Sequence, residues 1–191
     1  MPDQATSLRN LLLRESAAGD ALHSRLVVVA GGKPGLGVTT VSVNLAVALA
    51  RHGLRTVLID ADLQQPDAAI LCGCSQAPNL GEVLASRRDI HEALQRGPGG
   101  MQLIAGVNIA DAKSRGTEKS QVRFLRQLSS LAKHVDVFVV DAGSAPTEFA
   151  RQLFGPQRKS RFRCDFFPFV EPGVDFAVDC AICGGKGCRV C

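Results

Sequence analysis

The residues with the clearest chemical potential form a glycine-rich turn. Residues 31–40 read Gly-Gly-Lys-Pro-Gly-Leu-Gly-Val-Thr-Thr, between the apolar run 26–30 and the helical pattern 41–51. Glycines allow backbone N–H groups to converge on an anion, and the N-terminus of the following helix adds partial positive charge. The pattern therefore predicts a phosphate-binding loop. The residues expected to contact a nucleotide there are Gly32, Lys33, Gly35, Leu36, Gly37, Val38, Thr39 and Thr40.

This loop departs from the usual Walker pattern at one position. A Walker loop carries lysine after its last glycine and then threonine or serine, so that the ammonium meets the β- and γ-phosphates and the hydroxyl meets Mg²⁺. Thr39 is in place, but Val38 stands where the lysine belongs, and a lysine occurs five residues earlier, at Lys33. Because a valine cannot neutralise phosphoryl oxygens, we expect nucleotide binding without fast hydrolysis.

Three aspartates follow two other apolar runs. Asp60 and Asp62 come at the end of the run 56–60, and Asp141 follows the run 137–140. Carboxylates across a crevice from a phosphate-binding loop can hold Mg²⁺ and orient an attacking water. We expect Mg²⁺ to be held by Thr39, Asp60 and Asp141. The alternative is that these acidic residues only cap the ends of strands.

The elements around these residues alternate along the chain. Apolar runs predict strands at 26–30, 56–60, 101–105 and 135–140, and helical spacing predicts helices at 40–52, 80–86, 90–96 and 117–134. Continuously apolar strands fit a parallel sheet that is covered on both faces. The alternation indicates an α/β fold, a doubly wound and mainly parallel sheet, with ligands at the carboxyl ends of the strands.

Composition limits the classes of protein. The 191 residues are 46% hydrophobic and 21% charged, as in globular domains with one core. A net charge of +4 is mild, so nucleic acid is not an expected partner. We find no stretch of roughly 18 apolar residues that would form a membrane helix. The N-terminus lacks the pattern of a signal peptide, so the expected location is the cytoplasm.

Residues 25–153 resemble the MinD/ParA ATPases, whose loop reads Lys-Gly-Gly-x-Gly-Lys-Thr. The resemblance implies a P-loop NTPase domain with ATP or ADP and Mg²⁺ as cofactors, and a nucleotide-dependent homodimer. It also implies that Lys33 and Asp62 are catalytic, with Lys33 crossing the dimer interface to the partner's nucleotide. A complete domain of this family continues past Asp141 with further strands, so the domain is expected to be truncated.

Residues 1–24 predict an N-terminal amphipathic helix, over 3–14, and a linker. The pattern Asp-Gln-Ala-x-x-Leu-Arg resembles the start of FlhG-type regulators of flagellar number. The resemblance implies that this helix binds an FlhF-type GTPase and stimulates its GTP hydrolysis. The residues concerned are Asp3, Gln4, Ala5, Leu8 and Arg9. The alternative is a frayed amphipathic helix with no partner.

Residues 154–191 form a segment of different character, which resembles part of the phenylalanyl-tRNA synthetase α subunit. The resemblance implies that Phe167 and Phe169 are remnants of a pocket for the phenyl ring of phenylalanine. The segment lacks the motifs that would complete that site, so aminoacylation is not expected. Strand-like runs at 166–170 and 174–178 predict one hairpin that stays outside the sheet.

Four cysteines lie at the end of the same segment, in the pattern Cys-x₂-Cys-x₄-Cys-x₂-Cys. They supply the four thiolates that a tetrahedral Zn²⁺ requires. Free thiols are the equally weighted alternative. The residues are Cys180, Cys183, Cys188 and Cys191.

Three functions are compatible with these patterns. The leading hypothesis is an FlhG-like, ATP-binding regulator of a partner GTPase that acts in flagellar placement or number. The second is a P-loop module that binds partners without hydrolysing ATP. The third is a synthetase fragment without a complete active site. A nucleotide-binding titration separates the first two from the third, and an ATP turnover assay separates the first from the second.

Overall fold

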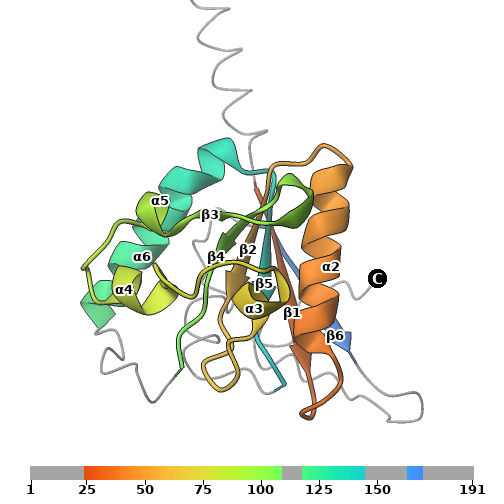
Figure 1. Ribbon diagram of the computed structural model, residues 1–191. Helices are drawn as coiled ribbons and strands as arrows, with labels where there is room; N and C mark the ends of the chain where they lie inside the picture. The colour runs from red at the N-terminus through yellow and green to blue at the C-terminus, as the bar shows by residue number, and fades with distance from the viewer. Residues whose placement is uncertain (1–23, 109–117, 145–162, 170–191) are drawn as a thin grey trace, which may run out of the picture.

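A computed structural model describes residues 24–108, 118–144 and 163–169 (Figure 1). Strands and helices alternate through these ranges. The strands are β1 (Arg25–Gly31), β2 (Thr56–Asp60), β3 (Gln95–Arg96), β4 (Gln102–Ile104), β5 (Val137–Asp141) and β6 (Arg163–Phe169). The α-helices are α2 (Val38–Arg51), α3 (Ala68–Leu71), α4 (Leu80–Leu84), α5 (Ile90–Ala93) and α6 (Glu118–Leu131). Within the described residues, none of the helices has the length and apolar character needed to cross a membrane.

One sheet organises the molecule, with strand order β3-β4-β2-β5-β1-β6. All neighbouring strands pair in parallel except β3 with β4. Asp141 of β5 stands opposite Val29 of β1 on one side and opposite Asp60 of β2 on the other. The predicted α/β fold with a mainly parallel sheet is therefore confirmed, and the carboxyl ends of β1, β2 and β5 meet at one edge.

Helices cover both faces of the sheet (Figure 1). The helices α2 and α3 lie on one face, and α4, α5 and α6 lie on the other. Side chains alternate along β1, so that Leu26 and Val28 pack with the α4–α6 layer while Val27 and Val29 pack with the α2–α3 layer. Because both faces are buried, the central residues of β1, β2 and β5 form continuous apolar runs, as the sequence predicts for a parallel sheet.

Most predicted elements are present with shifted ends. The predicted strand 101–105 is β4, and the predicted helix 117–134 divides into α6 and a short 3₁₀ helix, η2 (Ala132–His134). The predicted helix 90–96 ends at Ala93 as α5, and residues 95–96, predicted as helix, form β3 instead. The sequence analysis also missed α3, which is four residues long. Elements this short contain too few residues to show a helical or alternating period.

The prediction that the C-terminal segment stays outside the sheet is wrong for 163–169. These residues form β6, which pairs in parallel with the whole of β1, from Arg25 opposite Arg163 to Gly31 opposite Phe169. Without β6, that side of β1 would leave a row of backbone N–H and C=O groups unpaired in an apolar strand. Pro168 lacks an N–H, which suits its place in the outermost described strand. The other half of the predicted hairpin, 174–178, lies outside the described residues.

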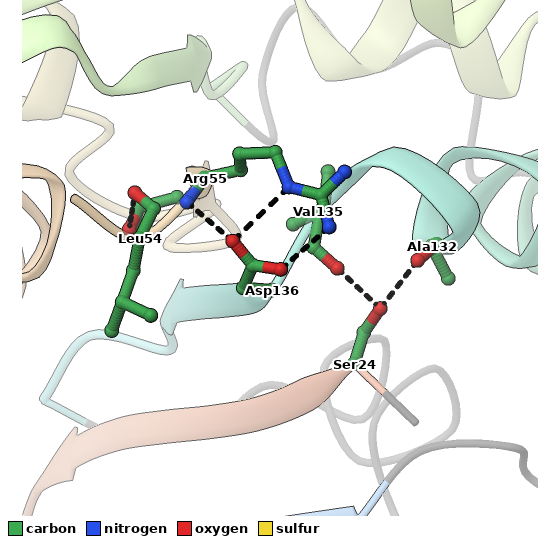
Figure 2. Close-up of polar contacts among 7 residues, drawn as sticks. Ser24, Leu54, Arg55, Ala132, Val135 and Asp136 are labelled. Atoms are coloured by element: carbon green, nitrogen blue, oxygen red, sulfur yellow. Dashed lines mark hydrogen bonds and ion pairs between the residues drawn. The ribbon is translucent and has the colours of Figure 1, made fainter. Parts of the chain in front are cut away.

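Two polar contacts join the amino ends of the strands (Figure 2). The guanidinium and backbone N–H of Arg55 donate to both carboxylate oxygens of Asp136, at 2.6–3.1 Å, which lowers the pKa of Asp136. The buried hydroxyl of Ser24 shares its proton between the carbonyl oxygens of Val135 at 2.6 Å and Ala132 at 2.7 Å. The start of β1 is thus joined to the segment that leads from α6 into β5.

We expect Ser24→Ala to lower the free energy of unfolding by about 1–2 kcal/mol, because two carbonyl groups lose their donor in a buried site. Urea unfolding followed by circular dichroism measures the change. Ser130→Ala, at an exposed position of α6, is the control and should leave the unfolding free energy nearly unchanged. Equal effects of the two substitutions would contradict a stabilising role for the Ser24 hydroxyl.

Candidate functional site

The glycine-rich turn connects the end of β1 to the start of α2. Gly35 (φ 82°) and Gly37 (φ 74°) adopt left-handed backbone conformations that L-residues rarely accept. The carbonyl of Gly37 accepts the N–H of Val41 at 2.9 Å, and Gly37 has no side chain to cap the helix. The first N–H groups of a helix have no partner within it, so this end of α2 is open to an anion. Lys33 and Thr40 are exposed on the loop and the first turn.

Val38 does not face the solvent side of this loop. It is 5% exposed and belongs to the core cluster that includes Val27, Val29 and Val43. Its Cγ2 lies 2.7 Å from where a Cβ on Gly31 would stand, so the valine fills the space above the last residue of β1. The position that holds the lysine of a Walker loop is therefore occupied here by a core side chain.

Asp141 presents an unsatisfied oxygen at the sheet edge. Its Oδ1 accepts the N–H of Gly143 at 3.1 Å, while Oδ2 is buried and has no hydrogen-bond partner within the described ranges. Burial raises the pKa of Asp141 to about 6, against the lowering effects of the Thr39 hydroxyl and the Gly143 N–H. A buried carboxylate oxygen beside a threonine hydroxyl offers the oxygen ligands that Mg²⁺ prefers.

Asp60 is fully buried and is used by the backbone. Its Oδ1 accepts the N–H of Asp62 and its Oδ2 accepts the N–H of Ala68, each at 3.1 Å. Burial, followed by the charge of Asp141, raises its pKa well above the usual value. A Cβ at Gly106 would lie 2.7 Å from the Asp60 Cγ, so glycine leaves room for this carboxyl group. In this conformation the Asp60 carboxyl group stabilises the turn that leads into α3, through these two hydrogen bonds.

Asp62 lies between that turn and the end of β5. It is 8% exposed, and its Oδ1 accepts the N–H groups of Gln64 at 2.9 Å and Gln65 at 3.2 Å. Its other oxygen, Oδ2, lies against Gly143, where any Cβ would overlap the carboxylate. The structure thus brings Asp62 to the same edge as Thr39, Asp60 and Asp141.

Gly143 is a site residue that the sequence analysis missed. It has a left-handed backbone (φ 71°), its carbonyl accepts the N–H of Gly31 at 2.9 Å, and its N–H donates to Asp141. One glycine thus contacts the start of the loop, Asp141 and Asp62. The signal available in the sequence was only the pattern Asp-x-Gly after an apolar strand.

The remaining predicted site residues fall in three places. Phe167 and Phe169 stand on β6, opposite Val29 and Gly31 of β1. Outside the described residues lie the predicted partner-binding positions Asp3, Gln4, Ala5, Leu8 and Arg9. The predicted zinc ligands Cys180, Cys183, Cys188 and Cys191 also lie outside them. Within the described residues, no three His, Cys, Asp or Glu side chains are placed so that they could hold one metal ion together.

We expect Asp141→Asn to stabilise the nucleotide-free protein by about 1–3 kcal/mol at pH 7.5. The pKa of Asp141 is raised to about 6 in the fold, from 3.8, so the ionised form is disfavoured above pH 6 and that cost disappears as the pH falls toward 3.8. The difference between variant and wild type should therefore shrink between pH 7.5 and pH 4. Urea unfolding across this range measures it, and a difference that grows on acidification would contradict the assignment.

Comparison with known proteins adds the family context. Residues 24–149 match the family model described as "AAA domain". Over 120 residues the chain is 32% identical to "Antiactivator FleN" of Pseudomonas aeruginosa, which covers 63% of this chain and 43% of that protein. The septum site-determining protein MinD of Pyrococcus horikoshii, solved with Mg-ADP, aligns with TM-score 0.56 and 22% identity over 66% of this chain and 52% of its own.

A second family model, "tRNA synthetases class II core domain (F)", matches residues 117–188. The phenylalanine–tRNA ligase α subunit of Chlorobium limicola is 49% identical over 65 residues, which are 34% of this chain and 19% of that subunit. Both models thus cover residues 117–149, which include α6 and β5. The chain spans less than half the length of either of these two curated relatives.

Proposed function

We propose, since this chain belongs to the AAA-domain family of P-loop ATPases in the MinD/ParA class, that it binds ADP or ATP with Mg²⁺ at the loop between β1 and α2. One observation gives this proposal its strongest support. The buried Oδ2 of Asp141 has no partner among the described residues and lies at the edge where Thr39 and the open end of α2 meet. A metal-bound phosphate would satisfy the carboxylate, the hydroxyl and the N–H groups together.

In this proposal, the residues at this edge have different roles in binding the phosphates, the Mg²⁺ and the attacking water. The N–H groups of the loop would hold the phosphates, while Thr39 and Asp141 would hold Mg²⁺, with Asp60 reaching it through water. Mg²⁺ supplies charge neutralisation of the phosphate oxygens. Asp62 would orient the attacking water once one of its oxygens leaves the turn at Gln64. Lys33, on the exposed loop, is suited to a nucleotide across a homodimer interface.

The biological role that we propose is that of an FlhG-like regulator in the cytoplasm. Its support is the similarity to FleN, whose name describes an antiactivator, together with the N-terminal pattern around Gln4. In this role, the helix at residues 3–14 would stimulate an FlhF-type GTPase, and the nucleotide domain would carry that helix. Val38 favours a second candidate as well, a module that binds nucleotide and partner without turnover.

Calorimetric titration with MgADP tests the nucleotide site. The wild type should bind, and Thr39→Ala should weaken binding at least roughly tenfold, since it removes a hydroxyl that meets the metal. Ser130→Ala removes an exposed hydroxyl of α6, on the other face of the sheet, and is the control. Absence of binding by the wild type at millimolar nucleotide, or equal effects of the two substitutions, would overturn the assignment.

The partner assay uses the full chain and an FlhF-type GTPase. We expect the chain to accelerate GTP hydrolysis and Gln4→Ala to remove that effect, whereas Ser7→Ala, in the same predicted helix, should retain it. No acceleration by the wild-type chain would refute the regulatory role while leaving the nucleotide site untouched. Acceleration without measurable ATP turnover would select the second candidate, a binding module.

A further inference from the structure

We infer that the nucleotide site binds MgADP and MgATP with nearly equal affinity, because Val38 removes the group through which the loop would recognise a γ-phosphate. The inference rests on the proposed function, namely that the loop between β1 and α2 binds a nucleotide. It states in addition how strongly the site distinguishes a nucleoside diphosphate from a nucleoside triphosphate.

The burial of Val38 shows why this residue cannot substitute for a lysine. Its side chain packs in the cluster with Val27, Val29 and Val43 and fills the space over Gly31. A lysine at this position of a Walker loop reaches the β- and γ-phosphates. A valine here offers no charge and no donor, and turning it toward the phosphates would empty the space that it fills in the core.

The groups that remain in the site treat the two nucleotides alike. Backbone N–H groups of the loop and the start of α2 meet the phosphates that ADP and ATP share. The other side of the site carries the carboxyl groups of Asp60, Asp62 and Asp141. Within one copy of the chain, a γ-phosphate therefore adds negative charge beside acidic side chains, without the Walker ammonium that normally compensates part of it.

The consequence concerns regulation. A site that holds ADP and ATP equally cannot report hydrolysis by releasing its product or by changing its occupancy. The chain would therefore present its partner-binding surface whichever of the two nucleotides the cell supplies. This behaviour differs from that of a switch whose state follows the γ-phosphate.

The experiment compares dissociation constants for MgADP and for Mg²⁺ with the non-hydrolysable β,γ-imido analogue of ATP, at fixed free Mg²⁺, by calorimetry. In the wild type we expect the two constants to agree within about threefold. Val38→Lys restores a charged donor and should favour the triphosphate by roughly tenfold or more. Val38→Leu also replaces the buried valine but brings no charge, so the ratio of its two constants should stay within about threefold.

Each outcome decides a different statement. A wild type that prefers the triphosphate tenfold or more overturns this inference and leaves the proposed nucleotide site standing. A wild type that binds neither nucleotide overturns the proposed function and the inference with it. Thermal unfolding checks whether Val38→Lys folds, and the wild-type ratio decides the inference even if that variant does not.

Discussion

Replacing Val38 with lysine is expected to raise the rate of ATP hydrolysis by about 10²-fold or more. A positively charged side chain held against the oxygens of the transferring phosphoryl group raises the rate by orders of magnitude. The wild-type chain has no such side chain at position 38. The other groups to which we assign the reaction, Thr39, Asp62 and Asp141, already lie at the same edge of the sheet. Phosphate release under saturating MgATP measures the effect.

The control for this experiment is the double substitution Val38→Lys with Asp62→Asn. It retains the new ammonium but removes the carboxylate that we assign to the attacking water, so its rate should fall back to the wild-type level. If Val38→Lys folds, binds ATP and still hydrolyses it no faster than the wild type, the lost lysine is not what limits turnover. The limit would then lie in another part of the site.

The second large effect is expected for Gly143→Ala, which should lower the free energy of unfolding by about 2–4 kcal/mol. An L-residue at φ 71° costs about 1–2 kcal/mol, and the new methyl group would also overlap the carboxylate of Asp62. Displacement of Asp62 would release the N–H groups of Gln64 and Gln65 as well. Urea unfolding measures the loss.

Gly53 provides a matched control for the cost of placing an L-residue at a positive φ. It also has a positive φ, 86°, but nothing lies within 4 Å of the position of its Cβ. Gly53→Ala should therefore cost only about 1–2 kcal/mol. Combining Gly143→Ala with Asp62→Ala removes the overlap and should recover part of the lost stability. Equal costs at Gly53 and Gly143, with no recovery in the double variant, would show that Asp62 does not pack against Gly143.

Local signals in the sequence were sufficient for much of the fold. Continuous apolar runs marked β1, β2 and β5 because a strand buried on both faces needs apolar side chains at every position. The glycines at 35 and 37 marked the loop because their backbone conformations are rare for other residues. Strand ends followed by aspartates located the candidate site, since the carboxyl ends of parallel strands share an edge.

Contacts between distant residues could not be read in the same way. Nothing near Asp60 in the sequence shows that its oxygens hold the N–H groups of Asp62 and Ala68, and nothing near Gly143 shows that it faces Asp62. The valine at 38 was visible as a missing charge, but its burial over Gly31 depends on how β1 and α2 meet. These relations arise from packing between segments, which no local period encodes.

The position of β6 is the clearest example of what tertiary structure decided. Residues 166–170 read locally as a strand, and the second strand-like run at 174–178 favoured a separate hairpin. Strand propensity does not specify a partner, because any strand offers the same row of backbone donors and acceptors. Pairing with β1 satisfies the open side of a strand that is buried from Leu26 to Gly31, and only the assembled sheet presents that side.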